Sequence, residues 1–117
     1  LIKLDRYQKQ FKFLYKNNIE TGTDLTNFQK SKEDRINELV EERKQLYASR
    51  TEENEPEVKE EAEKINAKLR ALRVEVRMCK AIIKDSYRIS EKYRQAKELK
   101  KQAEMEMKAN EYKRRGR

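Results

Sequence analysis

The sequence predicts an all-α protein, an elongated antiparallel helical hairpin of the coiled-coil type with additional N- and C-terminal helices. Three observations favour this fold. Apolar residues recur at heptad spacing in the middle of the chain, charged residues make up 44% of it, and it contains only two glycines and one proline. Charged helix formers with few helix breakers are typical of long helices rather than of a thick globular core. At 117 residues the chain is one domain, 1–117, and we expect it to be a C-terminal fragment of a longer protein.

The first helix is expected over residues 1–17. Its apolar residues at helical spacing are Ile2, Leu4, Tyr7, Phe11, Leu14 and Tyr15. We interpret its aromatic residues as packing groups for the hairpin or for an upstream domain, with stacking on nucleic-acid bases as the alternative. Asn17 and Asn18 end this helix, because asparagine tolerates the left-handed conformation. Thr21 is expected to cap the next helix, with Asp24 completing a capping box.

The second helix is predicted for residues 22–50 and the third for residues 56–84. The seam of the second consists of Leu25, Phe28, Lys32, Ile36, Leu39, Arg43 and Leu46, with Val40 and Tyr47 widening it. The seam of the third consists of Val58, Ala62, Ile65, Leu69, Leu72, Val76, Cys79 and Ile83, in steps of 4, 3, 4, 3, 4, 3 and 4. The short turn at 51–56 makes the two helices antiparallel neighbours. Facing residues should then have numbers that add up to roughly 106.

A fourth helix is expected at 90–110, after a break in the heptad at 84–89 and a new N-cap at Ser90. Its thin face would be formed by Tyr93, Ala96, Lys97, Lys100, Ala103 and Met107. Residues 111–117 form a basic tail that no burial is expected to order.

The formal net charge is +8 and is concentrated at the two ends of the chain. Residues 84–117 carry 12 basic and 6 acidic side chains, whereas residues 23–83 carry 13 and 14. On the third helix a second stripe runs beside the seam, consisting of Arg70, Arg73, Arg77, Lys80 and Lys84. It is interpreted as a contact surface for phosphates or an acidic partner, or alternatively as the ion-pairing partner of Glu33, Asp34 and Glu38 across the hairpin.

The composition excludes most catalytic chemistry. The chain contains no histidine, which excludes histidine-based metal sites, general bases and catalytic triads. Its single cysteine excludes a thiolate zinc site, and its two glycines are too few for a phosphate-binding loop. We therefore predict no enzyme activity, no metal and no cofactor in this chain. Cys79 is expected to be a free core thiol, which fits the reducing cytoplasm. The sequence has neither a signal peptide nor an apolar run of membrane-spanning length, so no membrane partner is expected.

Several segments together resemble the C-terminal helical region of relaxases, the mobilisation nucleases of integrative and conjugative elements of Gram-positive bacteria. The segments are Asn18-Ile19-Glu20-Thr21 with Asp24-Leu25, the helix from Ile36 to Leu46 with Glu41-Glu42-Arg43-Lys44, the stretch from Leu69 to Lys80 with Ile82 and Ile83, and the close from Glu106 to Arg115. The resemblance covers nearly the whole chain. It implies a bacterial, cytoplasmic setting.

Such relaxases nick one DNA strand at the origin of transfer through a tyrosine in an N-terminal, metal-dependent domain. The histidines of that domain are absent here, so no catalytic residue is carried over. The resemblance implies a non-catalytic accessory domain that docks the conjugation machinery, through a coupling protein or an auxiliary factor, and also contacts DNA. The expected DNA or acidic-partner contacts are Arg70, Arg73, Arg77, Lys80, Lys84, Lys113, Arg114, Arg115 and Arg117. The alternatives are a stand-alone coiled-coil protein that forms homodimers through its helices and a basic helical module that binds nucleic acid.

Overall fold

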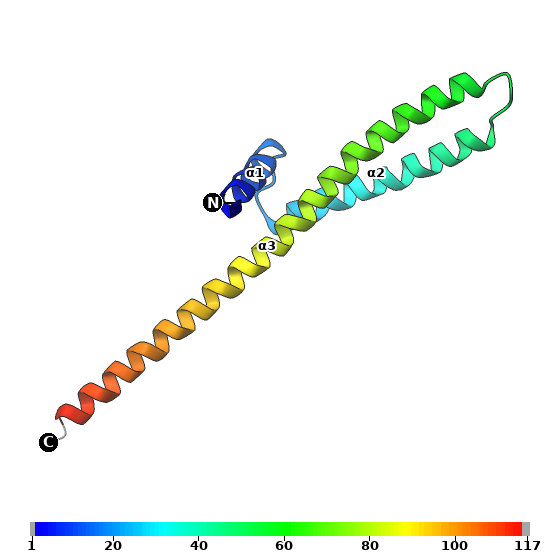
Figure 1. Cartoon of the computed structure of the whole chain (residues 1–117). Helices are drawn as coiled ribbons and strands as arrows, with labels where there is room; N and C mark the ends of the chain where they lie inside the picture. The colour runs from blue at the N-terminus through cyan, green and yellow to red at the C-terminus, as the bar shows by residue number, and fades with distance from the viewer. Residues whose placement is uncertain (1, 116–117) are drawn as a thin grey trace. The chain divides into compact units, whose positions relative to one another are not determined.

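The computed structural model describes residues 2–115, and the side chains of residues 4–111. It consists of α1 (Ile2–Lys16), α2 (Gly22–Ala48) and α3 (Glu55–Arg115), with no strand in the described range (Figure 1). The predicted all-α class is therefore confirmed. The chain divides into two compact units, Leu1–Ile82 and Ile83–Arg117. None of the described residues forms a helix long and apolar enough to cross a membrane.

The first unit contains the antiparallel hairpin formed by α2 and the adjoining part of α3 (Figure 1). Arg43 on α2 donates a hydrogen bond to Asn66 on α3 at 2.7 Å, and Lys32 lies 3.3 Å from the Glu75 carboxylate. These two pairs lie within three residues of the register predicted from the turn. Leu39 and Leu69, on the two facing helices, have exposed fractions of 1% and 0%.

The seam of α3 follows the prediction until its last residue. Val58, Ala62, Leu69, Val76 and Cys79 are buried, and Ile65 and Leu72 are half-buried. Ile83, in contrast, is exposed, and Ile82 is buried instead. The reason is a change of packing partner. Cys79 and Ile82 form a core cluster with Leu25 that contacts the end of α1 and the loop after it as well as α2. A shift of one residue turns the buried stripe by about 100° around the helix.

The prediction for α1 is partly wrong. Phe13, which lay outside the predicted face, packs edge-on against Phe28 of α2, with ring centroids 5.6 Å apart. Leu14 also packs against the core cluster, whereas Phe11 and Tyr15 are exposed. Because apolar residues occur on two overlapping faces of this helix, its spacing alone does not decide which face is buried.

The loop between α1 and α2 fixes the docked face. Asn18 has a φ of 55°, and the Ile19 amide donates to the Leu14 carbonyl oxygen at 2.9 Å. This is a Schellman-type helix end with asparagine in the left-handed position, as predicted. Thr21 and Asp24 form the predicted capping box at the start of α2. Ile19 packs on the core cluster, so the loop itself is anchored.

The second loop spans residues 49–54 and is held by reciprocal hydrogen bonds. The Thr51 amide donates to Asn54 Oδ1 at 2.6 Å, and the Asn54 amide donates to Thr51 Oγ1 at 3.3 Å. Pro56 lies in the first turn of α3, as expected for a residue that lacks a backbone N–H. α2 ends at Ala48, two residues before the predicted boundary.

The predicted helix break at 84–89 and the N-cap at Ser90 are wrong, because α3 continues from Glu55 to Arg115. The segment from 57 to 115 contains neither glycine nor proline, and a serine inside a helix lowers its stability only modestly. Loss of the heptad therefore changes what the helix packs against without ending the helix. The backbone of residues 111–115 is also helical, in place of the predicted disordered tail.

Candidate interaction surfaces

The basic side chains predicted to contact a polyanion lie on α3. We define the basic stripe as Arg70, Arg73, Arg77 and Lys80, all of which are exposed and belong to the first unit. Their steps of 3, 4 and 3 place them on one side of the helix, next to the buried seam. Lys84 is exposed on the same helix but belongs to the second unit.

The alternative interpretation of the basic stripe, ion pairing across the hairpin, is not what the structure shows. Glu33 accepts a hydrogen bond from Gln29, and Glu38 pairs with Arg35, each at 3.0 Å within α2. Among the described side chains, no ion pair or hydrogen bond involves Arg70, Arg73, Arg77 or Lys80. The positive charge of the basic stripe is therefore not neutralised by α2.

The acidic residues of this part of α3 do not neutralise the stripe either. Between residues 64 and 90 they are Glu75 and Asp85. Glu75 is turned toward the hairpin, where it pairs with Lys32, and Asp85 is buried with an exposed fraction of 5%. Apart from Glu75, whose side chain is 35% exposed and pairs with Lys32, the side chains that this stretch of helix offers to solvent are basic or uncharged.

A shallow groove of about 520 Å³ adjoins the basic stripe between α1 and α3. It is lined by Asp5, Arg6, Lys9, Gln10, Val74, Arg77, Met78 and Ala81. Arg77 belongs to both the groove and the basic stripe, so the exposed positive surface extends from α3 toward α1. Asp5 lowers the positive charge at the far wall of the groove. The apolar floor and basic rim suit a chain-like ligand with anionic groups better than an isolated ion.

The lone cysteine belongs to the core and not to either surface. Cys79 is fully buried, and burial raises the pKa of its thiol above the ordinary value, with a further contribution from the Glu75 carboxylate. Lys32 lies over the Phe28 ring, 5.0 Å from the ring centroid, while it pairs with Glu75. A buried thiol with a raised pKa is a poor nucleophile, so Cys79 is interpreted as a core residue and not as a reactive site.

We define the distal segment as residues 83–115 of α3, the described part of the second unit. Every side chain from 92 to 111 is exposed. Lys113, Arg114 and Arg115 lie on the helical backbone, and their side chains fall outside the described ones. Arg117 lies outside the described residues. The predicted contacts of these four residues therefore fall outside the described side chains.

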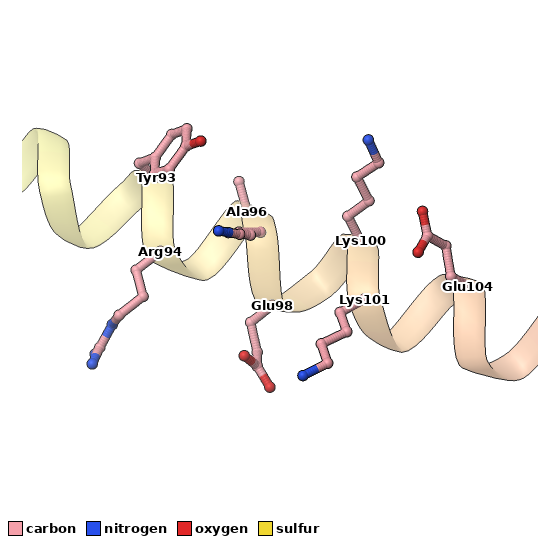
Figure 2. Close-up of a pocket in the computed structure, with 8 residues that line it drawn as sticks. Tyr93, Arg94, Ala96, Glu98, Lys100, Lys101 and Glu104 are labelled. Carbon is pink, nitrogen blue, oxygen red and sulfur yellow. The ribbon is translucent and has the colours of Figure 1, made fainter.

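A hollow beside the distal segment is an open helix surface. Its lining residues are Tyr93, Arg94, Ala96, Lys97, Glu98, Lys100, Lys101 and Glu104, all from one stretch of α3. Figure 2 shows Tyr93, Ala96 and Lys100 projecting on one side of the helix, and Arg94, Glu98 and Lys101 on the other. Because no second element closes this space, it is suited to docking a partner rather than to enclosing a small molecule.

Sequence reasoning missed two exposed apolar residues of the distal segment, Ile89 and Leu99, which are 48% and 67% exposed. The available signal was the heptad spacing of Ile89 with Tyr93 and Ala96, which the expected break at 84–89 concealed.

Comparison of the chain with protein-family models, curated proteins and solved structures gives no match. The interpretation of these surfaces therefore depends on their own charge, exposure and spacing.

Proposed function

We propose that this chain is a non-catalytic accessory domain of a conjugative DNA relaxase in the bacterial cytoplasm. It docks the transfer machinery, through a coupling protein or an auxiliary factor, and its basic surfaces contact DNA or an acidic partner. The observation that carries the proposal is the exposed and unpaired basic stripe on α3. The resemblance of Leu69–Lys80 and of the basic C-terminal residues to the relaxase family supports the setting.

The hairpin acts in this proposal as a rigid support. Core residues such as Leu39, Leu69 and Cys79 fix one face of α3 and leave the basic stripe on another. From Arg70 to Lys80 the helix rises by roughly 15 Å, so four cations lie along a line that several phosphates or carboxylates can follow. Each phosphate contact would release a counterion, and binding would weaken steeply as salt increases.

The docking role is tested in the element that encodes the chain. Arg114, Arg115 and Arg117 are replaced by Ala in the full-length protein, and transfer frequency and nicking at the origin are measured separately. We expect transfer to fall about tenfold or more while nicking is unchanged, because the catalytic chemistry resides elsewhere. Replacement of Lys30, Arg35 and Lys44 on α2 removes the same charge and serves as the control. Unchanged transfer in the tail variant would refute the docking role of these residues.

A second candidate function is direct nucleic-acid binding by the basic stripe, favoured by its lack of any acidic partner. The 117-residue chain is titrated with single- and double-stranded DNA at low and high salt. The variant Arg70→Gln, Arg73→Gln, Arg77→Gln is compared with Lys30→Gln, Arg35→Gln, Lys44→Gln, which removes the same number of charges. We expect the first variant to lose affinity and to show a smaller salt dependence, by about one unit of slope for each lost phosphate contact. Equal binding by both variants would exclude the stripe as the DNA surface.

A further inference from the structure

The distal segment is a long helix with an exposed apolar face. Tyr93 and Met107 are 71% and 72% exposed, and the flanking Leu99 is 67% exposed. An ion pair joins Arg94 to Glu91 at 2.8 Å, but it is exposed and supports the helix only weakly. Helices in water depend mainly on packing of an apolar face, so this segment gains stability from a partner.

The exposed face has the geometry of a coiled-coil seam. Its members are Ile89, Tyr93, Ala96, Lys100, Ala103 and Met107, which follow one another in steps of 4, 3, 4, 3 and 4. In heptad notation Tyr93, Lys100 and Met107 occupy a positions, and Ile89, Ala96 and Ala103 occupy d positions. Figure 2 shows Tyr93, Ala96 and Lys100 projecting from the same side of the helix. This face is distinct from the basic stripe of the first unit.

We propose that this face binds the same face of a second copy of the chain in an antiparallel coiled coil. In an antiparallel pair, a positions of one helix face d positions of the other, and g positions face each other. The register that places Leu99 opposite Leu99 of the second copy gives complementary layers. Tyr93 then faces Ala103, Met107 faces Ile89, and Lys100 faces Ala96 of the second copy. Large side chains meet small ones in the layers of Tyr93 and Lys100, as interdigitated packing requires.

The charges beside the seam favour this orientation. In the antiparallel register Lys92 lies beside Glu106 of the second copy, and twofold symmetry repeats the pair. A parallel, in-register dimer instead places Lys92 beside Lys97 and Glu106 beside Glu111. It also stacks Lys100 on Lys100 in the seam itself. The antiparallel register retains one like-charge contact of its own, between the two Lys97 side chains.

The proposed dimer does not depend on the proposed function, and the two respond oppositely to salt. Residues 84–117 carry 12 basic and 6 acidic side chains, so pairing two distal segments brings net positive charges together. Salt screens this repulsion and should strengthen the dimer, whereas it weakens binding to a polyanion. Loss of one activity with retention of the other therefore separates the two proposals.

The experiment measures dimerisation of the 117-residue chain by sedimentation equilibrium. Four charge variants are compared: the parent, Lys92→Glu, Glu106→Lys, and both together. We expect each single substitution to weaken the dimer about tenfold, because two symmetric attractions become repulsions, and the double substitution to restore it. A parallel dimer would respond to the single substitutions in the opposite way, since each replaces a like-charge contact by an attractive one.

Two further variants test the seam itself. Ile89→Glu should abolish dimerisation, whereas Tyr87→Glu, at a residue that is also exposed but lies on another side of the helix, should leave it unchanged. In a Cys79→Ala background, Leu99→Cys should form an interchain disulfide under oxidation, since the two copies of residue 99 meet only in the antiparallel register. A strict monomer at high concentration and high salt would overturn the proposal. So would single charge variants that strengthen association.

Discussion

Lys32 on α2 places its ammonium nitrogen 3.3 Å from a carboxylate oxygen of Glu75 on α3, and the same nitrogen lies over the Phe28 ring, 5.0 Å from its centroid. The paired oxygen of Glu75 is buried and has no partner with hydrogen-bond geometry. The contact is therefore an ion pair without a well-aligned hydrogen bond. A lysine inside an apolar seam is explained by this arrangement, since its ammonium group contacts the face of the ring while its charge balances a carboxylate.

Replacing Lys32 alone should lower the free energy of unfolding more than replacing Lys32 and Glu75 together. Lys32→Met leaves the buried Glu75 oxygen without a counter-charge, and we expect the free energy of unfolding to fall by about 1 kcal/mol. This loss is at the low end of the range for leaving a buried charged group unpaired, because both side chains are about a third exposed to solvent. The double variant Lys32→Met, Glu75→Met should recover most of the loss. Urea denaturation of the three proteins measures both effects, and an additive result would contradict the coupling.

Leu69→Ala should be among the most destabilising single substitutions in the hairpin. Leu69 is fully buried against α2, so truncation leaves a cavity and should lower the free energy of unfolding by about 2–5 kcal/mol. Val74→Ala provides the control, because Val74 lies on the same helix with an exposed fraction of 54%. Its effect should stay within about 0.5 kcal/mol. Similar losses in the two variants, measured by circular dichroism in urea, would place the core elsewhere.

The buried thiol predicts a pH dependence of stability. The pKa of Cys79 is raised in the folded protein, mainly by burial and also by the Glu75 carboxylate, so the folded state holds the thiol proton more tightly than the unfolded state. The stabilising contribution is complete below the unfolded pKa of about 8.5 and is lost as pH rises through the higher folded pKa. Between these values the wild-type chain should lose stability relative to Cys79→Ala.

The same thiol provides a direct measurement. Labelling of Cys79 by a thiol reagent should be slow in the folded chain and should accelerate in urea in step with unfolding, because the sulfur is fully buried. Equal labelling rates with and without urea would mean that the hairpin opens at this end.

Asn18 predicts a graded response to substitution. At a φ of 55° a side chain with a Cβ is strained, and glycine is not. We expect Asn18→Ala to destabilise the chain by about 1 kcal/mol, because alanine lacks the local hydrogen bonding that lets asparagine tolerate this conformation. Asn18→Gly should be neutral or slightly stabilising. Thermal unfolding of the two variants checks the order, and a more stable alanine variant would contradict it.

Local spacing and end signals predicted much of the hairpin. The sequence placed Lys32 and Arg43 in the seam of α2 despite their charge, and both lie there. Lys32 forms an ion pair with Glu75, and Arg43 donates a hydrogen bond to Asn66. The Asn18 helix end and the Thr21 cap depend on neighbouring residues only, so they too were predictable.

The remaining features depend on contacts between distant residues. Phe13, and not Phe11, packs into the core because Phe28 lies next to it in space. Ile82, and not Ile83, is buried because α1 docks on that end of the hairpin. The uninterrupted α3 was missed because a change of packing partner resembles a helix break in the heptad pattern. Of the predicted contact residues, the exposure of the basic stripe could be anticipated from its spacing. Its lack of acidic partners required the structure.

The short loop at 49–54 also sets an order of events in time. Contacts across the hairpin nearest this loop close small chain segments, so they form at low entropic cost and early. The contact of Phe13 with Phe28 is similarly local, but Leu14 and Ile19 reach the Cys79 end of α3 across some sixty residues and require the hairpin to exist first. The contacts between α2 and α3 should therefore form in sequence from the loop toward Cys79, and the docking of α1 should be the final and slowest step of folding.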